Sequence, residues 1–218
     1  MFKYVLFDMD GVLLDSASIH EESYLETFTH FGLKPSFKYA ENAGRTTIEV
    51  MTEISVQLSL DSSLVPQLVN KKQSLVREKF NHLEEPPLFP GTKSCLELIS
   101  KNYKIGLCTS ASRPTVEVFF RSGIPEDLFQ CVISAESVVK GKPDPEIYSS
   151  AMHILGAAPM DCVIVEDSIS GIIAGITSGS DVFHIGNHAS LGTLREEYLD
   201  KVTSFHDLEA MTRSLVCL

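Results

Sequence analysis

The chain has no tryptophan, no hydrophobic run of membrane-spanning length and a shortage of positive charge. Its 18 Lys and Arg residues stand against 29 Asp and Glu residues, which gives a formal net charge of −11 at pH 7. Such a negative surface repels phosphate backbones and anionic lipid heads. We therefore expect no binding to nucleic acid and no insertion into a membrane or attachment to its surface.

Cysteine usage points to a reducing compartment. The chain has five cysteines, an odd number, and no two of them form a CxxC motif. This argues against a disulfide framework or a zinc site. The apolar N-terminal segment meets Asp8 too early to form a secretory signal peptide. We expect a cytoplasmic protein, and because no apolar seam is left over, a monomer.

The sequence does contain an alternation of strands and helices. Segments rich in Val, Ile and Phe lack polar alternation, as strands covered on both faces do; they span residues 3–7, 103–108, 131–134, 162–165 and 181–185. Helical patterns follow at residues 92–101, 114–122, 145–155 and 169–178. This order predicts an α/β fold with a doubly wound, Rossmann-like parallel sheet.

Residues 15–87 differ from the rest and predict an inserted, all-helical cap. Helical patterns cover residues 19–31, 48–58 and 62–80. The second presents Ile48, Met51, Ile54 and Leu58 on one face, and Thr46 and Glu49 have the spacing of a capping box at its start. The predicted organisation is a catalytic core of residues 1–14 and 88–218, with a cap at 15–87.

Polar residues follow the predicted strands and should meet at one edge of the sheet, where parallel α/β proteins bind ligands. They are Asp8, Asp10 and Gly11 after the first strand, Thr109 and Ser110 after the second, Lys140 and Lys142 after the third, and Glu166 and Asp167 after the fourth. Clustered carboxylates repel one another unless a cation neutralises them, and a hard divalent ion such as Mg²⁺ prefers oxygen ligands. A lysine and a hydroxyl beside such a metal, with the free amides around Gly11, predict a phosphoryl site.

The motif Asp8-Met9-Asp10-Gly11-Val12 resembles the signature of the haloacid dehalogenase superfamily. Thr109, Lys142 and the pair Glu166-Asp167 stand at that family's other motif positions, and the helical insert is similar to that of its β-phosphoglucomutase-like branch. The resemblance covers essentially the whole chain.

The resemblance implies a role for each motif residue. Asp8 is the nucleophile that becomes an aspartyl-phosphate, and Asp10 is the general acid and base. Asp8, Asp167 and the Asp10 backbone carbonyl hold Mg²⁺, with Glu166 at or just outside the ligand shell. Thr109 and Lys142 bind the phosphoryl group, although Ser110 rivals Thr109 for that role and Lys140 rivals Lys142.

Two cap residues are further candidates for substrate binding. Arg45, in Gly44-Arg45-Thr46 before the second cap helix, could grip a distal anionic group; the alternative is a surface arginine paired with Glu41 or Glu49. His20 lies near the hinge and matches a substrate-side position of some family members; the alternative is an exposed helix histidine.

The predicted function is an Mg²⁺-dependent phosphatase acting on a small phosphorylated metabolite, such as a sugar phosphate or phosphoglycolate. A β-phosphoglucomutase is the alternative, but it needs a cationic residue on the long cap helix, and Glu78 stands where that lysine is expected, with Lys79 beside it. Asp10 and Asp167 argue against a dehalogenase. A phospho-receiver domain would have its acceptor Asp after the third strand, where Ser134 stands, and needs no helical insert.

Overall fold

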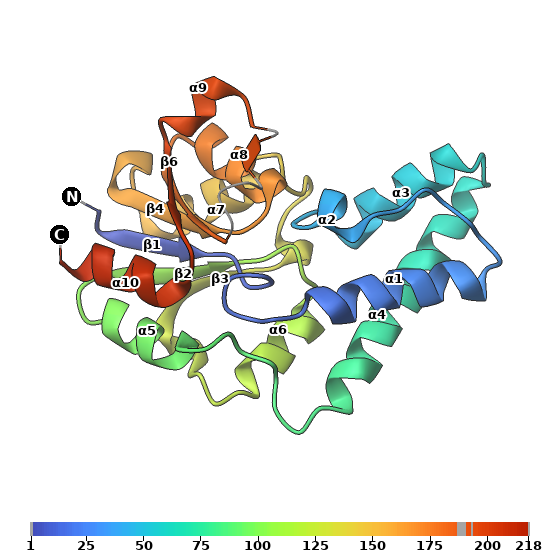
Figure 1. Ribbon diagram of the computed structural model, residues 1–218, viewed down its shortest axis with the longest axis horizontal. Helices are drawn as coiled ribbons and strands as arrows, with labels where there is room; N and C mark the ends of the chain where they lie inside the picture. Colours follow the sequence, from blue (N-terminus) through green and yellow to red (C-terminus); the bar gives the residue numbers. More distant parts are fainter. Residues whose placement is uncertain (1, 187–190, 193, 218) are drawn as a thin grey trace.

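The computed structural model describes residues 2–186, 191–192 and 194–217, and a parallel sheet forms its centre (Figure 1). The six strands of the described part pair in the order β3-β2-β1-β4-β5-β6, as a doubly wound fold requires. They are β1 Tyr4–Phe7, β2 Lys104–Cys108, β3 Phe129–Ile133, β4 Cys162–Glu166, β5 Asp181–Ile185 and β6 Val202–Phe205. All five predicted strands form, and every pairing is parallel. The edge strand β6 was not predicted because it is short and half polar.

Successive residues of the central strands face two separate hydrophobic layers. Val5 and Phe7 of β1 contribute to one buried cluster, whereas Leu6 contributes to the other. The first cluster includes residues of α5 (Thr92–Ile99), α6 (Arg113–Phe120) and α10 (Leu208–Val216); the second includes residues of α7 (Glu146–Leu155) and α8 (Ile169–Thr177). Helices therefore cover both faces (Figure 1), which explains why the strands read as continuous apolar runs.

The segment between β1 and α5 folds into the helical cap. Its helices are α1 Ala17–His30, α2 Tyr39–Asn42, α3 Thr47–Gln57, η1 Ser62–Leu64 and α4 Val65–Asn81. Tyr24, Phe28, Met51, Ile54 and Leu68 belong to a hydrophobic cluster of the cap's own. The predicted capping box of Thr46 and Glu49 is present. Of the four residues expected on one face of α3, Met51 and Ile54 are buried and Leu58 packs against this cluster, whereas Ile48 is 57% exposed.

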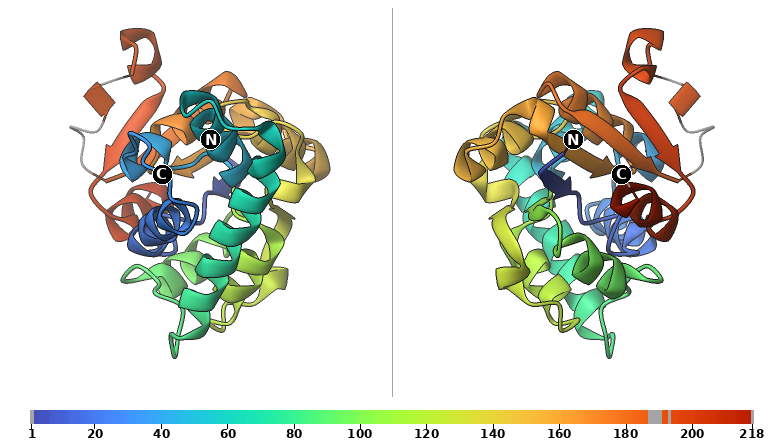
Figure 2. Two further views of the ribbon diagram at one scale, coloured as in Figure 1. Left: turned by 90° about the vertical axis from the view of Figure 1, so that its right-hand side faces the viewer. Right: turned by 90° about the vertical axis from the view of Figure 1, so that its left-hand side faces the viewer.

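The cap lies at the end of the core opposite the two termini (Figure 1). Figure 2 shows it from its free side, with α4 running across the molecule. Val76 and Phe80, near the end of α4, pack into the core's hydrophobic cluster. Leu14 forms an isolated bridge with Leu88 where the chain leaves and re-enters the core. The long helix and this bridge anchor the cap beside the strand ends.

The remaining described elements are short and peripheral. They are η2 Glu126–Leu128, η3 Ala135–Ser137, η4 Pro159–Asp161 and α9 Glu196–Leu199. None of the helices in the described ranges combines the length and hydropathy that crossing a bilayer requires.

Candidate active site

Asp8 lies at the carboxyl end of β1, in the middle of the sheet. The backbone N–H of Asp8 donates to the carbonyl of Val165 at 2.9 Å, which fixes the residue against β4. Its carboxylate accepts a hydrogen bond from Lys142 Nζ at 2.5 Å. Burial, with Glu166 and Asp10 nearby, raises the pKa of Asp8 to about 8 despite the lowering effect of Lys142. The site thus contains more buried negative charge than one lysine balances.

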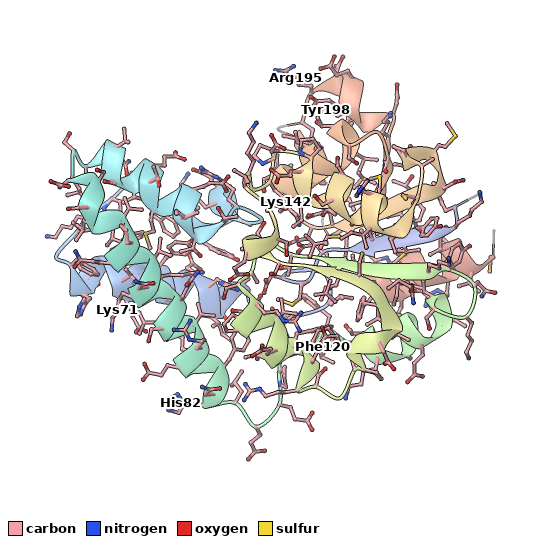
Figure 3. The ribbon with its side chains drawn as sticks, turned by 180° about the vertical axis from the view of Figure 1, so that it is seen from behind. Lys71, His82, Phe120, Lys142, Arg195 and Tyr198 are labelled. Carbon is pink, nitrogen blue, oxygen red and sulfur yellow. The ribbon has the colours of Figure 1, made fainter. Side chains whose placement is uncertain are left out.

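Lys142 comes from the loop between η3 and α7 and is completely buried. Its ammonium also donates to Glu166 Oε1 at 2.7 Å and to the carbonyl of Cys108 at 3.2 Å. Burial acts to lower the pKa of Lys142, but Asp8 and Glu166 together raise it, so the lysine stays charged. Lys140 instead extends into solvent and lies 3.6 Å from Asp144. Of the two lysines, Lys142 is the one in the site, at the junction of cap and core in Figure 3.

Both oxygens of Glu166 are already occupied by donors. Oε1 accepts from Lys142 and from the hydroxyl of Tyr148 at 2.6 Å. Oε2 accepts from the N–H groups of Asp167 and Ser168 and from the Ser168 hydroxyl, at 3.0 to 3.2 Å. Glu166 is therefore built to hold Lys142 in place. Sequence reasoning missed Tyr148, which lies on α7 and carries no motif of its own.

Asp167 completes a set of acidic groups that could hold a metal ion. Ligand atoms of Asp8, Glu166 and Asp167 lie within 4.8 Å of one another. The Asp167 carboxylate receives no hydrogen bond from the described residues, and burial, Glu166 and Asp8 raise its pKa well above the usual range. It packs against Gly11, whose φ is +87° and where a Cβ would lie 2.0 Å from Asp167 Oδ2. An under-compensated, oxygen-only set of this kind fits a hard divalent cation.

The Asp10 side chain turns away from that acidic set and towards the cap. Its Oδ1 accepts from the Ser16 hydroxyl at 2.5 Å and lies 3.2 Å from His20 Nε2, and its Oδ2 lies 3.5 Å from the Thr109 hydroxyl. Burial acts to raise the pKa of Asp10, but His20, Ser16 and Lys72 outweigh it and hold the pKa below its usual value. Asp10 is accordingly not among the residues whose ligand atoms gather at the acidic set.

Lys72 of α4 is a buried cap residue that the sequence reasoning missed. Its ammonium lies 2.9 Å from His20 Nδ1 and 3.4 Å from the Thr47 hydroxyl, and 4.5 Å above the Tyr24 ring. Burial lowers the pKa of Lys72 to about 8.

Expecting the cationic position of α4 at residue 78 was wrong. Lys79, beside it, binds Glu22 and Glu26 on the surface, whereas Lys72 faces the site. The available signal was a lysine within the buried face that Leu68, Leu75 and Val76 form on α4.

Arg45 lies on the cap side of the site with its guanidinium engaged. It lies 2.7 Å from Glu53 and donates to Asn42 at 3.1 Å, so its partners are neither Glu41 nor Glu49. The Ser110 hydroxyl donates to the Gly44 carbonyl at 2.6 Å, across the boundary between core and cap. Thr109 is therefore closer to Asp10, while Ser110 holds the cap.

These residues surround one cleft between core and cap. The predicted site residues that line it are Asp8, Asp10, Gly11, His20, Arg45, Thr109, Ser110 and Asp167. Lys142 and Glu166 lie beneath it, fully buried. Lining residues not predicted include Tyr39, Asn42, Thr47, Lys72 and Gln73, all from the cap. The core side of the cleft offers paired carboxylates over a buried lysine, and the cap side offers cations and hydrogen-bonding groups. This arrangement is suited to transferring a phosphoryl group from a polar molecule.

Comparison with known proteins agrees with this geometry. A family model described as haloacid dehalogenase-like hydrolase matches residues 5–185. The solved structure of a hydrolase from Pseudomonas syringae superposes with a TM-score of 0.81, at 18% identity, over 99% of this chain and 98% of that chain. That likeness shows a shared fold.

Similar sequences include phosphatases and a mutase. Hexitol phosphatase A of Escherichia coli is 29% identical in an alignment of 220 positions that covers 96% of this chain and 93% of that protein. A phosphorylated carbohydrates phosphatase of Thermotoga maritima is 33% identical over 80% of this chain and 81% of its own length. A β-phosphoglucomutase of Bacillus subtilis is 29% identical over 84% of this chain and 83% of its own length.

Proposed function

The chain belongs to the haloacid dehalogenase-like hydrolase family, and from that premise we propose that it is an Mg²⁺-dependent phosphatase that hydrolyses a small phosphorylated carbohydrate through an aspartyl-phosphate. The observation that carries this proposal is the placement of Asp8. Its carboxylate lines the cleft together with Asp10 and accepts a hydrogen bond from the buried Lys142.

In the first half of the reaction, an Asp8 oxygen attacks phosphorus in line with the leaving group. The bond between phosphorus and the sugar oxygen breaks, and Asp10, in the protonated form that the second half of the reaction regenerates, delivers its proton to that oxygen, so the free carbohydrate departs. Lys142 balances charge at Asp8. The Thr109 hydroxyl, 3.5 Å from Asp10 in the same cleft, is the group that would donate to the phosphoryl oxygens. Positioning and charge balance are the main demands of phosphoryl transfer.

In the second half, water hydrolyses the aspartyl-phosphate. Asp10 takes a proton from the water as its oxygen attacks phosphorus, the bond to Asp8 breaks, and inorganic phosphate leaves. Hydrogen bonds from Ser16 and His20 favour the ionised form of Asp10, which is the form that accepts this proton.

Asp8, Asp167 and the Asp10 backbone carbonyl are the groups that would hold Mg²⁺. The ion, when bound, neutralises charge on the carboxylates and on the phosphoryl group. Glu166 supports the arrangement through Lys142, because its own oxygens are filled by protein donors.

The cap's contribution fits a carbohydrate better than an apolar substrate. Asn42, Thr47, Gln73 and Arg45 line the cleft and offer donors and acceptors for several hydroxyl groups. The names of the two phosphatase relatives agree with this substrate class.

A mutase that passes phosphate between two positions of one sugar is the second candidate. Lys72 favours it, since this lysine supplies the cap cation that such an enzyme needs. The pairing of Arg45 with Glu53 favours the phosphatase, because that arginine is not free for a second phosphate.

The test is a phosphate-release screen of phosphorylated sugars, sugar alcohols and phosphoglycolate, with and without Mg²⁺. β-Glucose 1-phosphate with catalytic glucose 1,6-bisphosphate is assayed separately for glucose 6-phosphate. Release of phosphate that requires Mg²⁺ supports the phosphatase, and isomerisation without net release supports the mutase. Neither activity on any substrate would reject both.

A further inference from the structure

The loop that presents Lys142 is tied to the cap by one carboxylate. The backbone N–H of Gly141 donates to Glu49 Oε1 at 3.0 Å, although the two residues are 92 positions apart. The next residue is Lys142, whose ammonium binds Asp8 and Glu166. A cap residue therefore holds the peptide that carries the buried lysine of the site.

The second oxygen of Glu49 fixes the direction of this contact. Oε2 accepts from the Thr46 backbone N–H at 3.1 Å and from its hydroxyl at 2.6 Å, which closes the capping box of α3. Because the capping box holds the Glu49 side chain in one orientation, Oε1 is already aimed at the core when the cap is in place.

The fit at Gly141 leaves no room for a side chain. A Cβ at this position would lie 2.5 Å from Glu49 Oε2 and 2.6 Å from the Thr46 methyl group. The cap thus contacts bare backbone beside Lys142, and an added carbon here would displace the Glu49 carboxylate or the Thr46 methyl group.

On its other side, the loop is held by the core itself. The N–H groups of Val139 and Lys140 donate to the Glu146 carboxylate at 2.8 and 2.9 Å. Two glutamates therefore fix the loop, Glu146 from the core and Glu49 from the cap. Ser170 of the core also binds this edge of the cap, because its hydroxyl donates to the Ala43 carbonyl at 2.7 Å.

We propose that Glu49 is a positioning residue that couples the seating of the cap to the placement of Lys142. When the cap lifts, the Gly141 N–H loses its acceptor and the backbone before Lys142 keeps only its bonds to the core; when the cap seats over a substrate, the contact with Glu49 is restored. This inference rests on the proposed phosphatase function. It adds a hydrogen bond through which the position of the cap affects the position of Lys142 in the core.

The test compares Glu49→Gln, Gly141→Ala and the double variant with the unchanged protein. A glutamine keeps the helix cap by accepting from Thr46, but then turns its amide NH₂ towards Gly141 and cannot accept from it. Asp61→Ala is the matched control, since Asp61 caps η1 through Ser63 N at 2.8 Å in an exposed part of the cap and makes no hydrogen bond or ion pair with the core residues that the structure describes.

Each protein is assayed on p-nitrophenyl phosphate and on the best phosphorylated carbohydrate. We expect either single change to lower kcat about 10-fold on both substrates with KM for the aryl ester within about twofold, as loss of a hydrogen bond to a charged group predicts. The double variant is expected to be no worse than the poorer single one, because both remove the same contact. A loss confined to the carbohydrate, or losses that add, would overturn the coupling.

Hydrogen exchange tests the contact independently of activity. The backbone amides of residues 139–142 and 144 are expected to exchange about 10-fold faster in Glu49→Gln and no faster in Asp61→Ala. Unchanged exchange in Glu49→Gln overturns the inference. If the unchanged protein hydrolyses no phosphate ester, the proposed function fails, while this measurement still decides whether Glu49 holds the loop.

Discussion

Lys72 of the cap helix α4 lies 2.9 Å from Nδ1 of His20. An ammonium group can only donate, so Nδ1 is the acceptor and the ring proton of neutral His20 sits on Nε2, the nitrogen 3.2 Å from Asp10. A chain of two hydrogen bonds therefore runs from the cap to the proposed acid and base.

The charge of Lys72 gives the cleft a pH dependence. Burial lowers its pKa to about 8, against the raising effect of Asp10, and the groups around it are His20, Thr47 and the Tyr24 ring. The cation is present below pH 8 and is lost as the pH rises. From pH 7 to pH 9, we expect KM for a substrate with a second anionic group to rise about tenfold, with KM for p-nitrophenyl phosphate nearly constant. In Lys72→Met this step should vanish; its persistence would contradict the assignment.

Asp8→Asn removes the proposed nucleophile. Because the amide cannot form an acyl phosphate, we expect phosphate release to fall at least about 10⁴-fold, and beryllium fluoride no longer to protect the protein against thermal unfolding. Asp15→Asn, an exposed aspartate on the same segment, is the control and is expected to retain full activity. Turnover by Asp8→Asn within tenfold of the unchanged protein would reject covalent catalysis at this residue.

The hydroxyl of Tyr148 supports a buried charge, which makes it costly to remove. Tyr148→Phe deletes a 2.6 Å hydrogen bond to Glu166 and is expected to lower the free energy of unfolding by about 1.5 to 3 kcal/mol. Tyr103→Phe deletes a 2.8 Å hydrogen bond to the neutral carbonyl of Leu215 and is expected to cost about 0.5 to 1.5 kcal/mol. Urea denaturation measures both, and equal costs would mean that Glu166 draws no extra stabilisation from Tyr148.

The pairing of Arg45 with Glu53 predicts that a substitution of Glu53 strengthens the binding of substrates that carry two phosphate groups. In Glu53→Ala the guanidinium loses its 2.7 Å partner and becomes available to the cleft. We expect KM for a sugar bisphosphate to fall about three- to fivefold, which matches the strength of a partly exposed ion pair. Glu41→Ala, which removes an exposed cap glutamate paired with Lys38, controls for the general loss of negative charge. An equal fall in both variants would show that Arg45 is not responsible.

Local patterns were enough to predict the sheet and the residues at its strand ends. Strands covered on both faces are short apolar runs, and Asp8, Asp10, Thr109, Lys142 and Asp167 each follow such a run directly or in its connecting loop. The helices and strands missed were α2, α9, α10 and β6. Three of them have four residues each, and α10 has nine. Their apolar residues are too few to stand out without the neighbours they pack against.

The sequence by itself determined the α/β fold, the inserted cap and the acidic set over one lysine, because these depend on residue order along adjacent segments. Only the tertiary structure decided which side chains support them. Lys72, Tyr148 and the link from Glu49 to Gly141 join segments distant in the chain, and no local pattern specifies how far apart such segments lie. The packing of cap against core sets those distances, and with them the charge, shape and coupling of the site.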